Sequence, residues 1–175
     1  MVSREVLAQR AGVWKGRATG DVRIIELVGD RLVLKMGRDL PLVPLSADRF
    51  SLLGSYSIRF ETEGGKPVLV PEQNALGKDR FDLVPAYRPG AADLAAFSGD
   101  YRAPELDVTW RIVSDSAGLR AELRGRELAR LAPTYADHFS SPEGSLAFRR
   151  DRQGRVTAFT VQAGRVRNIL FTRVP

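Results

Sequence analysis

The stretch LVPLSADRF, from Leu42 to Phe50, returns later in the chain as LAPTYADHF, from Leu131 to Phe139. Both copies follow the pattern LxPxxADxF, and they lie 89 residues apart in a chain of 175 residues. A repeat at about half the chain length indicates two equivalent modules. We expect the shared residues to be structural anchors of each module: Leu42, Pro44, Asp48, Phe50, Leu131, Pro133, Asp137 and Phe139.

A second pattern precedes each copy of this nonapeptide. The sequence LxxxxGxW ends at Trp14, and the same spacing, with tyrosine in place of tryptophan, ends 87 residues later at Tyr101. Ser3 and Asp93 stand before these patterns as candidate caps of a short helical turn. Each module is therefore expected to begin with a helical turn that leads into a strand.

Alternating apolar residues predict a hairpin in each module. Residues 22–36 alternate around a turn at Gly29 and Asp30, and residues 108–124 alternate around a turn at residues 115–118. Trp110 lies in the second hairpin, and with Trp14 and Tyr101 it is an expected interior aromatic residue. At the usual strand length, each module of about 80 residues holds seven or eight strands.

These strands predict an all-β fold of two tandem small antiparallel barrels of about eight strands each. Closure into a barrel removes the exposed strand edges of so small a unit. The first barrel is expected over residues 1–86 and the second over residues 93–175, with a linker at residues 87–92 that contains Pro89 and Gly90. The alternative is one continuous sandwich built from both copies.

The late part of the first module differs from that of the second. Pro67, Pro71 and residues 73–78 interrupt a segment that is a regular strand pattern in the second module. Because proline cannot donate a hydrogen bond to a strand ladder, we expect an edge strand or a distorted pairing here.

The chain contains no recognisable catalytic or metal-binding constellation. It has no cysteine and a single histidine, His138, at the position where the first module has Arg49. GxSxG, SxxK, GxGxxG and P-loop motifs are all missing. We therefore predict no catalytic residue, no cofactor and no metal site. His138 is expected on an exposed strand edge, and Asp48 and Asp137 are expected to accept backbone hydrogen bonds in equivalent turns.

The composition argues against two classes of partner. The formal net charge is +6, and the arginines are interleaved with acidic residues such as Glu122 and Asp151, so no nucleic-acid partner is expected. No apolar stretch approaches the roughly 18 residues of a membrane span. The repeated aromatic residues could line a pocket for an apolar ligand, but side chains can fill so narrow a barrel, which favours core packing.

The combined pattern resembles a known type of accessory domain. The resemblance rests on the following features in order: LxxxxGxY, a hairpin with a leucine-rich strand, LxPxxxDxF, a phenylalanine-bearing strand, a glycine turn and FxR at Phe171 to Arg173. In these features the chain is similar to the lipocalin-like C-terminal domains of serine hydrolases. These hydrolases, such as D-aminopeptidases, belong to the β-lactamase and penicillin-binding-protein class. The likeness is clearest from Leu94 to Pro175, and the first copy has Leu83 where FxR has its arginine.

The resemblance implies a non-catalytic accessory role, because the catalytic SxxK of that family lies in an upstream domain. Such a module would pack on the hydrolase domain of the same natural chain, shape access to its active site or mediate self-association. It would be periplasmic or secreted if the parent hydrolase is exported. The alternative is a freestanding lipocalin-like binder that holds a small apolar ligand in one barrel, and an enzyme in its own right is the third reading.

Overall fold

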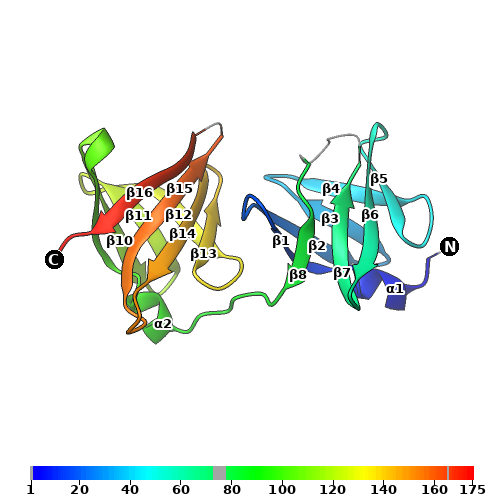
Figure 1. The fold of residues 1–175 in the computed structure, drawn as a ribbon, viewed down its shortest axis with the longest axis horizontal. Helices are drawn as coiled ribbons and strands as arrows, with labels where there is room; N and C mark the ends of the chain where they lie inside the picture. The colour runs from blue at the N-terminus through cyan, green and yellow to red at the C-terminus, as the bar shows by residue number, and fades with distance from the viewer. Residues whose placement is uncertain (1, 73–77, 165) are drawn as a thin grey trace. The chain divides into compact units, whose positions relative to one another are not determined.

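A computed structural model describes residues 2–72, 78–164 and 166–175 of the chain (Figure 1). The chain divides into two compact units, Met1–Ala86 and Tyr87–Pro175. Each unit contains one closed antiparallel barrel of eight strands. The predicted all-β fold of two tandem barrels is confirmed, and the alternative of one shared sandwich is excluded because each sheet closes on itself.

The first barrel follows a short helix, α1 (Arg4–Ala8), and its strands pair in the order of the chain. Its strands are β1 (Gly12–Gly16), β2 (Val22–Val28), β3 (Arg31–Lys35), β4 (Asp39–Pro44), β5 (Arg49–Leu52), β6 (Tyr56–Glu63), β7 (Lys66–Pro71) and β8 (Phe81–Val84). Pairing of β1 with β8 closes the sheet.

The second barrel repeats this plan after the helix α2 (Ala91–Ala95). Its strands are β9 (Gly99–Ala103), β10 (Val108–Asp115), β11 (Gly118–Leu123), β12 (Arg126–Pro133), β13 (His138–Ser141), β14 (Gly144–Arg150), β15 (Val156–Ala163) and β16 (Val166–Arg173). A 3-10 turn, η1 (Pro104–Leu106), joins β9 to β10, and pairing of β16 with β9 closes the sheet.

Both helices are capped at their N-termini, but in different ways. The Ser3 hydroxyl accepts a hydrogen bond from the Val6 amide at 3.3 Å, as expected. The N-cap of α2 is Gly90 rather than Asp93. Asp93 lies one turn into the helix, and its carboxylate accepts a hydrogen bond from the Gly90 amide at 3.0 Å, which is the N3 half of a capping box.

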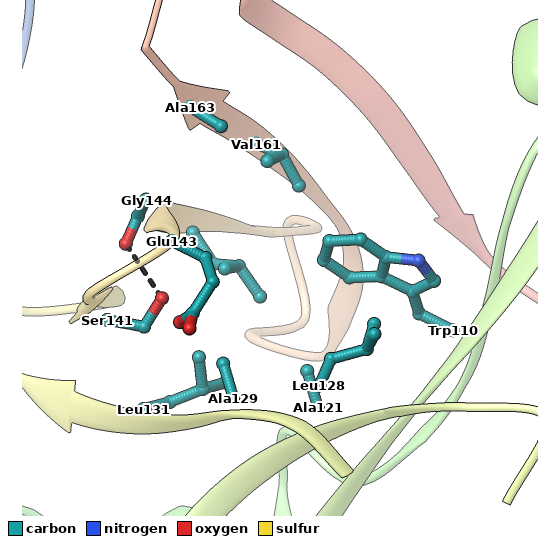
Figure 2. Close-up of a pocket in the computed structure, with 11 residues that line it drawn as sticks. Trp110, Ala121, Leu128, Ala129, Leu131, Ser141, Glu143, Gly144, Val161 and Ala163 are labelled. Carbon is teal, nitrogen blue, oxygen red and sulfur yellow. Dashed lines mark hydrogen bonds between the residues drawn. The ribbon is translucent and has the colours of Figure 1, made fainter. Parts of the chain in front are cut away.

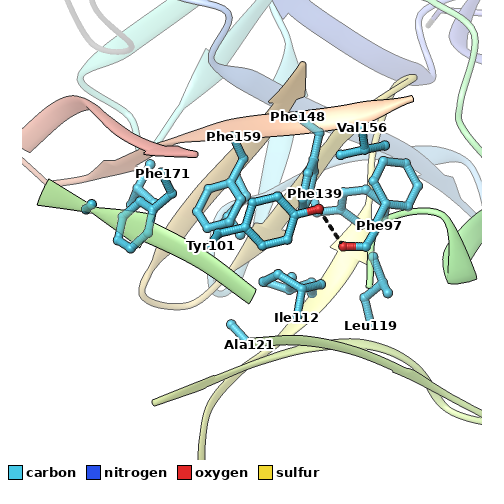
Figure 3. Close-up of a cluster of buried hydrophobic side chains, with 14 residues drawn as sticks. Phe97, Tyr101, Ile112, Leu119, Ala121, Phe139, Phe148, Val156, Phe159 and Phe171 are labelled. Atoms are coloured by element: carbon cyan, nitrogen blue, oxygen red, sulfur yellow. Dashed lines mark hydrogen bonds between the residues drawn. The ribbon is translucent and has the colours of Figure 1, made fainter. Parts of the chain in front are cut away.

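A buried aromatic residue is fixed in the same way near the start of each barrel. The Trp14 indole N–H donates to the Arg10 carbonyl at 3.1 Å, and the Tyr101 hydroxyl donates to the Phe97 carbonyl at 2.8 Å, as Figure 3 shows for the second. Both rings are fully buried. The donor therefore satisfies a carbonyl after the helix while the ring fills the core.

The nonapeptide anchors recur in equivalent structural positions. Phe50 and Phe139 are fully buried and lie opposite Pro44 and Pro133 across neighbouring strands. Leu42 and Leu131 are buried in the cores of their respective barrels.

The aspartates of the nonapeptide repeat a hydrogen bond through their main chain. The carbonyl oxygens of Asp48 and Asp137 accept from the amides of Phe60 and Phe148, both at 2.7 Å. The two carboxylates differ. That of Asp48 accepts from the Ser46 hydroxyl at 2.5 Å, which lowers its pKa.

The Asp137 carboxylate instead forms an ion pair with Arg150 at 2.8 Å. This pair raises the pKa of the Arg150 guanidinium. Each aspartate therefore accepts a backbone hydrogen bond in an equivalent turn, as expected, and the shared acceptor is its main-chain carbonyl.

Of the two alternatives expected for the late strand of the first barrel, the edge strand is wrong, whereas a shortened pairing on one side is present. β7 pairs along its length with β6 and also pairs with β8, because the sheet closes. Its pairing with β8 covers two positions, Val68 with Asp82 and Leu69 with Phe81. Pro67 and Pro71 lie near the two ends of β7. Residues 73–77 of the interrupted segment lie outside the described part of the chain.

Residues 87–92 belong to the second unit, although they were expected to form a linker. The Tyr87 amide donates to the Thr134 carbonyl at 2.8 Å, and its ring packs edge-on against Phe139 at 6.2 Å. The helix α2 then begins at Ala91. Aromatic packing and a main-chain hydrogen bond thus fix a segment whose proline and glycine content had suggested a free connection.

Replacement of Tyr101 by phenylalanine is expected to lower the free energy of unfolding of the second barrel by about 1 to 2 kcal/mol. The change removes a buried donor and leaves the Phe97 carbonyl without its partner. Urea unfolding followed by amide NMR signals of the second barrel measures the effect. Tyr56→Phe, at a side chain with 42% exposure, is the control and should change little. Equal effects in both variants would contradict this role of Tyr101.

Candidate apolar binding site in the second barrel

A cavity of about 170 Å³ lies at one end of the second barrel (Figure 2). This end carries the turns that join β11 to β12, β13 to β14 and β15 to β16, whereas the β10–β11 turn lies beside α2 at the other end. The lining residues are Trp110, Ala121, Leu128, Ala129, Leu131, Ser141, Glu143, Gly144, Leu146, Val161 and Ala163.

Strand register shows which residues of the first barrel correspond to the cavity wall. In the first barrel, Ile25 pairs with Leu34, which pairs with Leu40. In the second barrel, the equivalent Ile112 pairs with Ala121, which pairs with Ala129. Two leucines of the first barrel are thus alanines in the second.

A third position differs in the same direction. Leu52 lies two residues after Phe50 on β5, and Ser141 lies two residues after Phe139 on β13. Leu34, Leu40 and Leu52 are all buried and belong to one core cluster, so they fill this end of the first barrel. Loss of three large side chains within a fixed backbone leaves space, which accounts for the cavity in the second barrel.

The side wall of the cavity is an indole ring held by other aromatic rings. Trp110 lies at the position of Arg23, since Trp110 pairs with Tyr101 and Arg23 pairs with Trp14. The Trp110 ring packs on Phe171 with centroids 4.7 Å apart. Phe171 in turn stacks on Phe159 at 4.8 Å. These contacts hold the half-buried Trp110 against the core.

The interior surface of this cavity is almost entirely apolar. Of the described residues that line it, Glu143 is the only one that carries a charge. The Ser141 hydroxyl donates to the Gly144 carbonyl at 3.2 Å, so this polar pair satisfies itself near the turn. An apolar cavity of similar size, about 150 Å³, is known to bind benzene or xenon. The space suits one ring or one branched alkyl group.

The expected interior aromatic residues do not all serve the same purpose. Trp14 and Tyr101 are buried core residues, and only Trp110 borders the cavity. Among the nonapeptide anchors, Leu131 alone lines it. The small residues that make the space, Ala121 and Ala129, were not singled out from the sequence. Ala121 could have been identified from the sequence by aligning the two modules at the 87-residue offset, because this alignment sets Ala121 against Leu34.

His138 is not on an exposed edge, so that expectation is wrong. Its side chain is buried, with Nδ1 2.6 Å from the Thr134 hydroxyl and its ring stacked on Tyr135 at 4.5 Å. In the first barrel, Arg49 stands at this position and pairs with Glu72 at 2.7 Å. The histidine thus replaces an ion pair by a buried hydrogen bond and ring stacking.

Across residues 2–72, 78–164 and 166–175, no three His, Cys, Asp or Glu side chains gather in a way that could hold a metal ion. Neither helix in the described part of the chain is long and apolar enough to cross a membrane.

No family model matches the chain, and no curated protein matches it. The fold and the cavity therefore define the class by themselves. The chain is a tandem two-barrel protein with an apolar pocket in its second barrel.

Leu40→Ala is expected to lower the free energy of unfolding of the first barrel by about 2 to 5 kcal/mol, because it opens in that barrel the space found beside Ala129. Urea unfolding followed by amide NMR signals of the first barrel measures the loss. Leu53→Ala is the control, because Leu53 is 57% exposed, and it should cost much less. A similar small loss in both variants would show that Leu40 does not fill the barrel end.

Proposed function

We propose that the chain is a non-catalytic binding module whose second barrel receives a small apolar group. The supporting observation is the cavity formed where Ala121, Ala129 and Ser141 stand in place of three buried leucines. Loss of core side chains normally destabilises a protein, so a retained cavity with an accessible apolar wall favours a ligand. In the first barrel the three leucines are in place and buried.

The size of the cavity limits the expected affinity. Drug-sized pockets measure about 300 to 1,000 Å³, and this cavity is smaller, so it receives a group of about six or seven heavy atoms. Burial of such a group in an apolar site gives a dissociation constant of roughly 0.1 to 1 mM. A larger ligand would place one end in the cavity and keep the remainder outside the barrel.

Toluene is expected to bind the second barrel and to shift the NMR signals of Trp110, Ala121 and Ala129. Ala129→Leu should abolish these shifts, because leucine restores the side chain that fills the first barrel. Ala92→Leu, at an exposed position in α2, is the matched control and should leave toluene binding intact. Absence of saturable shifts in the unmodified protein, or identical binding by Ala129→Leu, would contradict the proposed site.

An accessory role beside a serine hydrolase domain is the second proposal, and a feature of the closing motif favours it. The guanidinium of Arg173, the arginine of FxR, donates to the carbonyls of Ser98 and Val156, the latter at 3.1 Å. It also lies over the Tyr101 ring, 5.8 Å from its centroid. A residue that carries the family resemblance therefore ties the end of β16 to the starts of β9 and β15 at one end of the barrel, which supports a motif role in such a module.

The natural reading frame tests this accessory role. We expect it to encode, upstream of the present sequence, a domain with an SxxK motif, and we expect an export signal if the parent hydrolase is periplasmic or secreted. A frame that starts at Met1, with no hydrolase domain attached, would contradict the accessory proposal. It would leave the binding proposal intact, because that proposal depends on the cavity.

A further inference from the structure

The mouth of the cavity carries one acidic side chain. Glu143 lies in the turn between β13 and β14, directly before Gly144. Figure 2 shows its carboxylate turned toward the cavity, between the side chains of Ser141 and Leu131. A charged group is thus placed beside an apolar space large enough for a ring.

This carboxylate differs from most acidic groups of the second barrel. Seven acidic groups pair with arginines: Asp100 with Arg111, Asp107 with Arg102, Asp115 and Glu122 with Arg120, Glu127 with Arg130, Asp137 with Arg150, and Asp151 with Arg155. Glu105, in η1, has no arginine partner in the described part of the chain but does not line the cavity. Within the described residues, no hydrogen bond or ion pair involves Glu143. In an arginine-rich unit, an acidic side chain at the cavity without a partner is available to a ligand.

The Ser141 and Glu143 side chains both offer acceptors at the mouth. The Ser141 hydroxyl uses its hydrogen for the Gly144 carbonyl, so its oxygen presents lone pairs, as does the Glu143 carboxylate. A carboxylate or phosphate on the ligand would meet like charge and find no donor among these groups. A protonated amine offers up to three donors and the opposite charge.

We infer that the group bound by the second barrel is a primary amine attached to a ring or branched alkyl group, with the apolar part in the cavity and the ammonium at Glu143. This inference rests on the proposed function. A primary alkylamine resembles the lysine side chain, whose pKa is about 10.4, so it is charged at neutral pH. The cavity selects the size of the apolar part, and Glu143 selects the charge.

The test compares benzylamine with benzyl alcohol, which have the same ring and the same number of heavy atoms. In NMR titrations at low salt, we expect benzylamine to bind the unmodified protein about three- to fivefold more tightly, the effect of one exposed ion pair. In Glu143→Gln the ratio of the two affinities should fall to about one. Higher salt should also reduce the ratio, because salt screens exposed charges.

Two controls separate this inference from the proposed function. Glu5→Gln removes the same charge from α1 in the first unit and should keep the preference for benzylamine. Ala129→Leu should abolish binding of both compounds. Equal binding of the two compounds to the unmodified protein, or a preference that survives in Glu143→Gln, would overturn the amine inference and leave the apolar site standing. Failure of both compounds to bind would overturn both proposals.

Discussion

Closure of an eight-stranded sheet is the constraint on which both barrels depend. A closed sheet of this size has no free edge, and its interior is just wide enough to be filled by side chains or to hold one small ligand. Main-chain hydrogen bonds fix the wall, so the size of the inward-facing residues decides whether the interior is filled. Leu34 and Leu40 fill it in the first barrel, whereas Ala121 and Ala129 leave space in the second.

Features that repeat in the sequence also repeat in the structure. The two copies of LxPxxADxF predicted two modules, and Phe50 and Phe139 are indeed equivalent core residues. Predictions from single residues succeeded less often. The prolines of β7 suggested an edge, but closure of the barrel gives that strand two neighbours. His138 appeared to be a surface residue, yet Thr134 and Tyr135 provide it with a buried environment.

The candidate site could be predicted only in part. Trp110 was recognised as an interior aromatic residue because of its place in an alternating pattern, and it does border the cavity. Alanine and serine give no local sign of a cavity, because the space depends on what faces them across the sheet. The strand register shows that Ala121 lies opposite Ala129 and that both correspond to leucines of the other module. The orientation of Glu143 depends on the turn and also required the structure.

The cavity of the second barrel has a practical consequence for protein engineering. Its wall positions contribute side chains to the interior while the main chain at the same positions forms the strand ladder. Side-chain volume can therefore be altered there without a change in strand register. The first barrel, with leucines at the equivalent positions, supplies a reference for any redesign within the same polypeptide. One barrel of the tandem chain can therefore be redesigned around its cavity while the other keeps the leucines at the same positions.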